Sequence, residues 1–83
     1  MQIDIKSLAD LSEDDLVILK GLRSVGAATP TDLAVRMGRM TEEVEPLLKK
    51  LRARGLVVAI PRESGYEREI FRVSPSGLSL LHS

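Results

Sequence analysis

The sequence predicts an α+β fold in which three helices are followed by a β-hairpin and a short last helix. Three early segments show apolar residues at helical spacing, with start and stop signals at their ends. Two β-rich runs around a glycine-containing turn follow, and a serine–proline pair opens a final apolar segment. No linker or repeat interrupts this order, so we expect one domain over residues 1–83. Its expected parts are an N-terminal extension (1–11), a three-helix core (12–54), a hairpin (55–73) and a C-terminal helix (74–82).

The first helix is expected over about residues 13–24. Ser12 is a good N-cap, and three acids follow it in the first turn, where the helix dipole stabilises them. Leu16, Leu19 and Leu22 recur at helical spacing and predict the face that is buried. Two residues beyond this helix a glycine ends the pattern.

The second helix is expected over about residues 30–37. Residues 27–29 precede it as a short connector or a single strand rung. Thr29 can cap the helix, and Pro30 suits its first position because proline has no N–H to leave unpaired. Gly38 then provides a left-handed stop, which predicts a tight turn before the next helix.

The third helix is expected over about residues 42–54, with Thr41 as its cap. Four apolar residues lie at i, i+3, i+4 and i+7, so they form one face. Gly55 ends the helix, and the basic residues before it suit the negative end of the dipole. The apolar face consists of Val44, Leu47, Leu48 and Leu51.

Residues 56–60 and 70–73 are expected to pair as a hairpin around a glycine turn. Pro61 closes the first run and argues that this strand lies at an edge, because proline cannot donate to a neighbouring strand. Ser74 and Pro75 repeat the cap-plus-proline start, so a short helix is expected up to the chain end.

This order of elements resembles a winged helix-turn-helix domain, and it is most similar to MarR-type transcriptional regulators. The matching segments are TPTDLAVRMG in the second helix, VEPLLKKLRARGLV from the third helix into a strand, and FRVSPSGLSLL from a strand into the last helix. The resemblance covers about residues 12–82. It implies a DNA-binding regulator whose third helix enters the major groove and whose hairpin is the wing.

Eight side chains are the expected contacts to DNA if the resemblance holds. The residues of the third helix are equally explained as surface charge near a helix end, and the arginines of the wing alternate with glutamates as in cross-strand ion pairs. The expected contact residues are Arg36, Arg39, Thr41, Lys49, Lys50, Arg52, Arg62 and Arg68.

Glu42, Glu43 and Glu45 occupy the part of the third helix that usually contacts bases. The simpler reason for them is that the helix dipole stabilises acids in a first turn. A carboxylate can accept a hydrogen bond from cytosine N4, but three carboxylates near phosphates would repel them. The alternative function is therefore a winged-helix protein–protein interaction module in a larger assembly, and an RNA-binding winged helix is a third hypothesis.

The net charge is zero, but it is unevenly distributed. Residues 1–15 carry five acids against one base, whereas residues 46–83 carry seven bases against three acids. A local basic surplus suits contact with phosphates, so double-stranded DNA is the expected partner.

The residue types argue against catalysis and against a membrane. There is no cysteine, His82 lies beside the last residue, and no phosphate loop or nucleophile–base pair is present. We expect no enzyme activity, no metal and no cofactor. No apolar run approaches the roughly 18 residues of a membrane span, and the N-terminus lacks a signal pattern, so a cytoplasmic protein is expected.

The N-terminal segment is more apolar than a free tail needs. Its apolar residues are expected to pack on the first helix, or to form a homodimer or protein-partner surface with two leucines near the chain end. The residues concerned are Ile3, Ile5, Leu8, Leu11, Leu80 and Leu81.

Overall fold

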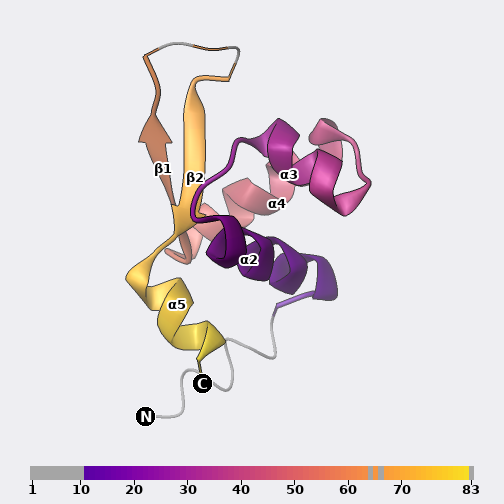
Figure 1. The fold of residues 1–83 in the computed structure, drawn as a ribbon. Coiled ribbons are helices and arrows are strands. Elements are labelled where there is room, and N and C mark those ends of the chain that lie inside the picture. The colour runs from indigo at the N-terminus through magenta and orange to yellow at the C-terminus, as the bar shows by residue number, and fades with distance from the viewer. Residues whose placement is uncertain (1–10, 64, 66, 83) are drawn as a thin grey trace.

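The computed structural model describes residues 11–63, 65 and 67–82. Three helices pack together, and the hairpin extends away from them with the last helix at its base (Figure 1). This arrangement confirms the predicted α+β winged helix-turn-helix class. The elements in chain order are α2 (Glu13–Val25), α3 (Pro30–Met37), α4 (Thr41–Ala53), β1 (Val57–Pro61), β2 (Glu69–Val73) and α5 (Pro75–Leu81).

Helices α2 and α3 begin at the caps that the sequence predicts. The Ser12 hydroxyl accepts the Asp15 N–H at 3.1 Å, and the Asp15 carboxylate accepts the Ser12 N–H at 3.1 Å. In α3 the Thr29 hydroxyl accepts the Asp32 N–H at 3.1 Å. A cap of this kind typically stabilises a helix by about 0.5–2 kcal/mol. These local hydrogen bonds explain why both starts could be read from the sequence.

The expected cap of α4 was wrong by one residue. Met40 is the N-cap residue, in an extended conformation, and Thr41 is already the first helical residue. The Met40 side chain has no hydroxyl to cap with, so the Glu43 carboxylate instead accepts the Met40 N–H at 3.1 Å. The Thr41 hydroxyl lies 3.3 Å from the Thr31 hydroxyl, and it therefore links the starts of α3 and α4.

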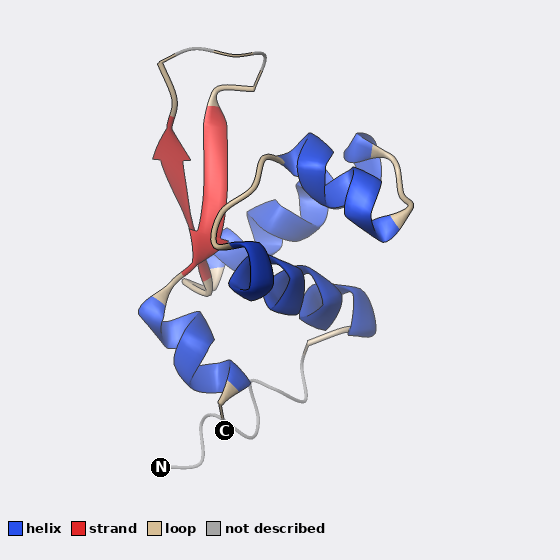
Figure 2. Ribbon diagram, viewed as in Figure 1, coloured by secondary structure: helices blue, strands red, loops and turns tan. Residues whose placement is uncertain are grey.

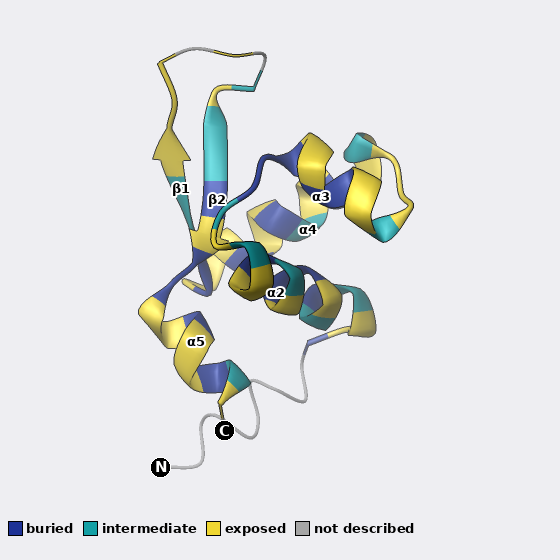
Figure 3. Ribbon diagram, in the orientation of Figure 1, coloured by how far each residue is buried: buried dark blue, intermediate teal, exposed yellow. Residues whose placement is uncertain are grey.

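One apolar core joins the helices and the hairpin. The buried faces of α2 and α4 turn toward each other, while their outer faces are exposed (Figure 3). Full burial of each large aliphatic side chain stabilises the fold by about 1.5–3 kcal/mol. The largest fully buried apolar side chains are Ile18, Leu19, Leu22, Leu33, Leu48, Leu51, Val44 and Val57.

A one-residue bridge joins the hairpin to the connector before α3. Strands β1 and β2 pair antiparallel, with Val57 opposite Val73 and Pro61 opposite Glu69 (Figure 2). On the other side of β2, Ala28 and Phe71 exchange two backbone hydrogen bonds of 3.0 and 2.8 Å. The connector before α3 thus forms the predicted strand rung, and β1 lies at the edge, as its proline suggested.

The N-terminal apolar residues divide between the core and the part of the chain that is not described. Leu11 is buried in the core cluster, as is Leu80 of α5, and Leu81 packs against that cluster. The other members of the expected dimer or partner surface, Ile3, Ile5 and Leu8, lie outside the described residues.

The Ser-x-x-Gly sequence at the start of α5 holds this helix against the base of the hairpin. The Ser74 hydroxyl donates to the Gly55 carbonyl at 2.6 Å and accepts the Gly77 N–H at 3.0 Å. Gly77 is buried, and a Cβ there would collide with the Leu56 carbonyl oxygen and lie 2.6 Å from Val73 Cγ1. The close approach of α5 therefore requires glycine at this position.

We expect Gly77→Ala to lower the free energy of unfolding by about 1–3 kcal/mol, because backbone atoms must move to admit the methyl group. Alanine has a higher helix propensity than glycine, so helix propensity alone would instead raise the free energy of unfolding. Denaturant unfolding measures the change, with Ser76→Ala on the exposed side of the same helix as the control. A stability equal to or above that of the parent would contradict the packing argument.

Candidate nucleic-acid interface

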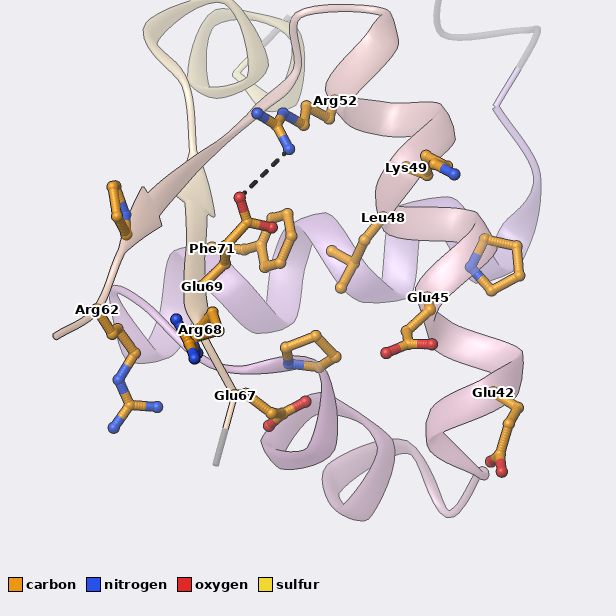
Figure 4. Close-up of a pocket in the computed structure, with 13 residues that line it drawn as sticks. Glu42, Glu45, Leu48, Lys49, Arg52, Arg62, Glu67, Arg68, Glu69 and Phe71 are labelled. Atoms are coloured by element: carbon orange, nitrogen blue, oxygen red, sulfur yellow. Dashed lines mark ion pairs between the residues drawn. The ribbon is translucent and has the colours of Figure 1, made fainter. Parts of the chain in front are cut away.

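A groove of about 980 Å³ lies between the outer face of α4 and the hairpin (Figure 4). Leu48 and Phe71 contribute apolar surface to it, and Pro30 brings in the start of α3. Pro46 and Pro61 also line it, and the other lining residues are charged, with acids and bases in equal number. The acids are Glu42, Glu45, Glu67 and Glu69, and the bases are Lys49, Arg52, Arg62 and Arg68.

The groove brings together half of the expected contact residues. Lys49 and Arg52 come from α4, whereas Arg62 and Arg68 come from the two sides of the hairpin turn. The other four expected residues are not among those that line it. They are Arg36, Arg39, Thr41 and Lys50.

Arg52 forms an ion pair across the groove with the wing. Its guanidinium lies 3.5 Å from the Glu69 carboxylate, and both side chains are about half exposed (Figure 4). Exposed ion pairs of this kind contribute only about 0–1 kcal/mol. A phosphate could therefore compete for this guanidinium at small cost.

Lys50 points toward α2, where it pairs with a buried carboxylate. Its ammonium lies 2.8 Å from Oδ2 of Asp15, and the Asp15 side chain is 0% exposed. Burial raises the pKa of Asp15, but hydrogen bonds from Lys50 and Ser12 and the charge of Lys50 outweigh it, so the pKa lies below its ordinary value of 3.8. Within the described residues, the second carboxylate oxygen has no hydrogen-bond partner. Lys50 therefore holds α4 against α2.

Arg39 has a comparable structural contact at the turn between α3 and α4. Its guanidinium donates to both oxygens of Asp14 in α2, at 2.9 and 3.1 Å. Both side chains are about 40% exposed, so the pair is accessible to solvent. Arg36 is exposed on α3, and it forms no ion pair with the described part of the chain.

Glu67 anchors the wing at the start of α3. Both of its carboxylate oxygens accept the Thr31 N–H, at 3.2 and 3.3 Å. The first N–H groups of a helix have no partner within the helix, and the dipole there favours an anion. This contact was not predicted from the sequence, because the two residues are 36 positions apart. The one general signal for it is that the first N–H groups of any helix require a hydrogen-bond acceptor.

The three glutamates of α4 have different environments. Glu43 accepts the Met40 N–H and so stabilises the start of the helix. Glu42 and Glu45 are exposed and line the groove, and neither forms an ion pair among residues 11–63, 65 and 67–82. In Figure 4 the Glu45 carboxylate points into the groove, whereas that of Glu42 points away from the wing at the helix start.

The described residues contain no group of three or more His, Asp or Glu side chains that could hold a metal ion. Among their helices, none is both long enough and apolar enough to cross a membrane.

The fold is shared with solved structures, although no family model and no curated protein matches the sequence. A mutant of MarR from E. coli, complexed with operator DNA, matches 92% of this chain with a TM-score of 0.82 and 17% identity. The YusO protein of Bacillus subtilis matches 95% with a TM-score of 0.84 and 14% identity. RV1404 of Mycobacterium tuberculosis matches 89% with a TM-score of 0.83 and 14% identity.

This chain spans about half the length of those structures, covering 54% of the MarR chain, 55% of YusO and 51% of RV1404. At such identities the likeness establishes a MarR-like winged helix-turn-helix fold.

We expect Lys50→Met to lower the free energy of unfolding at neutral pH by about 1–3 kcal/mol, because the buried Asp15 carboxylate loses its cation. The folded-state pKa of Asp15 is depressed, so its pairing stabilises the fold above about pH 4 and this contribution is lost as pH falls through the folded-state pKa. The difference between variant and parent should therefore shrink on acidification.

Urea unfolding between pH 7 and pH 3 tests this expectation. Lys49→Met is the matched control, because it removes the same charge from the adjacent residue, which lines the groove. A difference between Lys50→Met and the parent that persists unchanged at pH 3 would show that lost packing, not the charge pair, is responsible.

We expect Glu67→Ala to increase amide hydrogen exchange at Thr31 by about two- to fivefold, since an anion at a helix start contributes about 0.3–1 kcal/mol. Exchange measured by NMR, with Glu63→Ala in the exposed hairpin turn as the control, gives the comparison. Equal Thr31 exchange in the two variants would mean that the wing carboxylate does not hold this amide.

Proposed function

We propose that this chain is a single winged-helix unit that binds double-stranded DNA in the cytoplasm as a transcriptional regulator. The observation that carries this proposal is the groove between α4 and the hairpin, with Lys49 on one wall and Arg62 and Arg68 on the other. The MarR structure that shares the fold is complexed with operator DNA, which supports the proposal.

In this proposal α4 enters the major groove, which is wide enough to admit one helix. Lys49 on α4 and Arg62 and Arg68 on the wing contact phosphates on either side. Arg52 joins them by exchanging Glu69 for a phosphate. These residues supply affinity and register, because phosphate contacts position a protein on DNA without reading its sequence.

The remaining expected residues have two proposed roles. Arg36 on α3 and Thr41 at the start of α4 are proposed to contact the DNA backbone. Lys50 and Arg39 are proposed to keep α4 at a fixed angle to α2, because each already pairs with an aspartate of that helix. Misplacement of a reading helix weakens every contact that it makes, so such positioning pairs matter for binding as well as stability.

A second function is favoured by the charge balance of the groove. Four acids and four bases line the groove, and such a surface also suits a protein partner of mixed charge. In that case the chain would be an interaction module in a larger assembly. The N-terminal residues Ile3, Ile5 and Leu8 are proposed as a second contact, either with that partner or with another copy of the chain, which paired DNA half-sites would require.

We expect Lys49→Ala and Arg68→Ala each to weaken binding to duplex DNA and to lower the salt dependence by about one unit of slope, because each removes one phosphate contact. Titrations at two or more salt concentrations measure both effects. Lys20→Ala, on the exposed surface of α2 and away from the groove, should leave affinity and slope unchanged.

Absence of salt-sensitive binding to any duplex at low ionic strength would refute DNA binding. Stable capture of a protein partner that Lys49→Ala and Arg68→Ala release would then support the interaction module.

A further inference from the structure

We infer that α4 recognises cytosine through Glu45, which makes Glu45 the specificity-determining residue of this surface. The inference rests on the proposed DNA binding and adds the base that the helix selects. Glu45 is exposed, points into the groove and forms no ion pair with the described residues (Figure 4).

Other acids near this surface already have structural partners. Glu43 accepts the Met40 N–H, Glu67 accepts the Thr31 N–H, and Glu69 pairs with Arg52. Each contact holds a helix start or links the wing to a helix. These carboxylates are therefore explained by the fold.

Glu42 and Glu45 remain, and the helix dipole separates them. Glu42 is the second residue of α4, inside the first turn, where the dipole stabilises an acid. Glu45 is the fifth residue, and the dipole effect falls off beyond the first turn. Neither capping nor the dipole thus accounts for a carboxylate at position 45.

The chemistry of a carboxylate limits what Glu45 can read. An ionised carboxylate only accepts hydrogen bonds, so it needs a donor at the base edge. In the major groove, guanine offers N7 and O6 and thymine offers O4, all of which are acceptors. Adenine offers an N6 donor beside the N7 acceptor, which repels the second carboxylate oxygen. Cytosine's own edge offers the N4 donor and no acceptor, so of the four bases it fits a carboxylate best.

Lys49 reduces the electrostatic cost of bringing the Glu45 carboxylate close to DNA. Lys49 lies four residues further along α4, on the same side of the helix, and both residues line the groove. Its charge offsets the repulsion between the Glu45 carboxylate and nearby phosphates. A wrong base would leave the carboxylate without a donor, so Glu45 also rejects sites that lack cytosine.

The test is selection from a randomised duplex library, followed by titration of the selected duplex with single base-pair replacements. For the parent chain we expect one required cytosine, whose replacement weakens binding about fivefold or more. In Glu45→Gln the preference at that position should move from cytosine to adenine, because a carboxamide pairs with adenine N6 and N7. Glu13→Gln makes the same charge change in the first turn of α2 and should leave the selected sequence unchanged.

The possible outcomes distinguish this inference from the proposed function. A Glu45→Gln variant that binds every duplex more tightly, with the parent's base preference, would show that Glu45 only repels phosphate. Binding by the parent chain without any base preference would equally overturn the inference while leaving DNA binding intact. Failure of the parent to bind any duplex would overturn both.

Discussion

The backbone bridge between Ala28 and Phe71 is the contact on which the candidate site depends. A two-stranded hairpin is at best marginally stable in water, so it needs a third partner or a helix to pack on. Here the connector before α3 bonds to the open edge of β2, and the Phe71 side chain is buried beside it. This rung places the hairpin opposite α4, and the Glu67–Thr31 contact holds it there. The hairpin and α4 therefore form the two sides of the groove, because the Ala28–Phe71 bridge and the Glu67–Thr31 contact both attach the hairpin near the start of α3.

Much of the charge in this domain is used to position its parts. Lys50 and Arg39 join α4 and the preceding turn to α2, and Arg52 joins α4 to the wing. Of these pairs, Lys50–Asp15 constrains orientation most, because the Asp15 carboxylate is buried and would be costly to leave unpaired. Among the described residues, Arg36, Lys49, Arg62 and Arg68 form no ion pair and stay available to a polyanion.

Local signals predicted most of the fold, and contacts between distant residues escaped prediction. Ser12 and Thr29 act within three residues of themselves, so the starts of α2 and α3 follow from the sequence. The start of α4 was misplaced because a threonine beside a helix looks like a cap, whereas the turn after Gly38 makes Met40 the N-cap. In the site, the structure places Lys49 on the groove and pairs Lys50 with Asp15. Nothing local in the sequence distinguishes these two adjacent lysines, which differ in the direction they face.

The sequence by itself determined the order of elements, the apolar faces and the glycine stops, because these depend on spacing and backbone preference over a few residues. It also determined that the third helix begins with acids. Only the tertiary structure decided what the acids beyond that helix start do: Glu67 and Glu69 hold the wing, and Glu45 faces an open groove. The physical reason is that a charge acquires its role from the partner that packing brings within hydrogen-bonding distance, and that partner can be dozens of residues away.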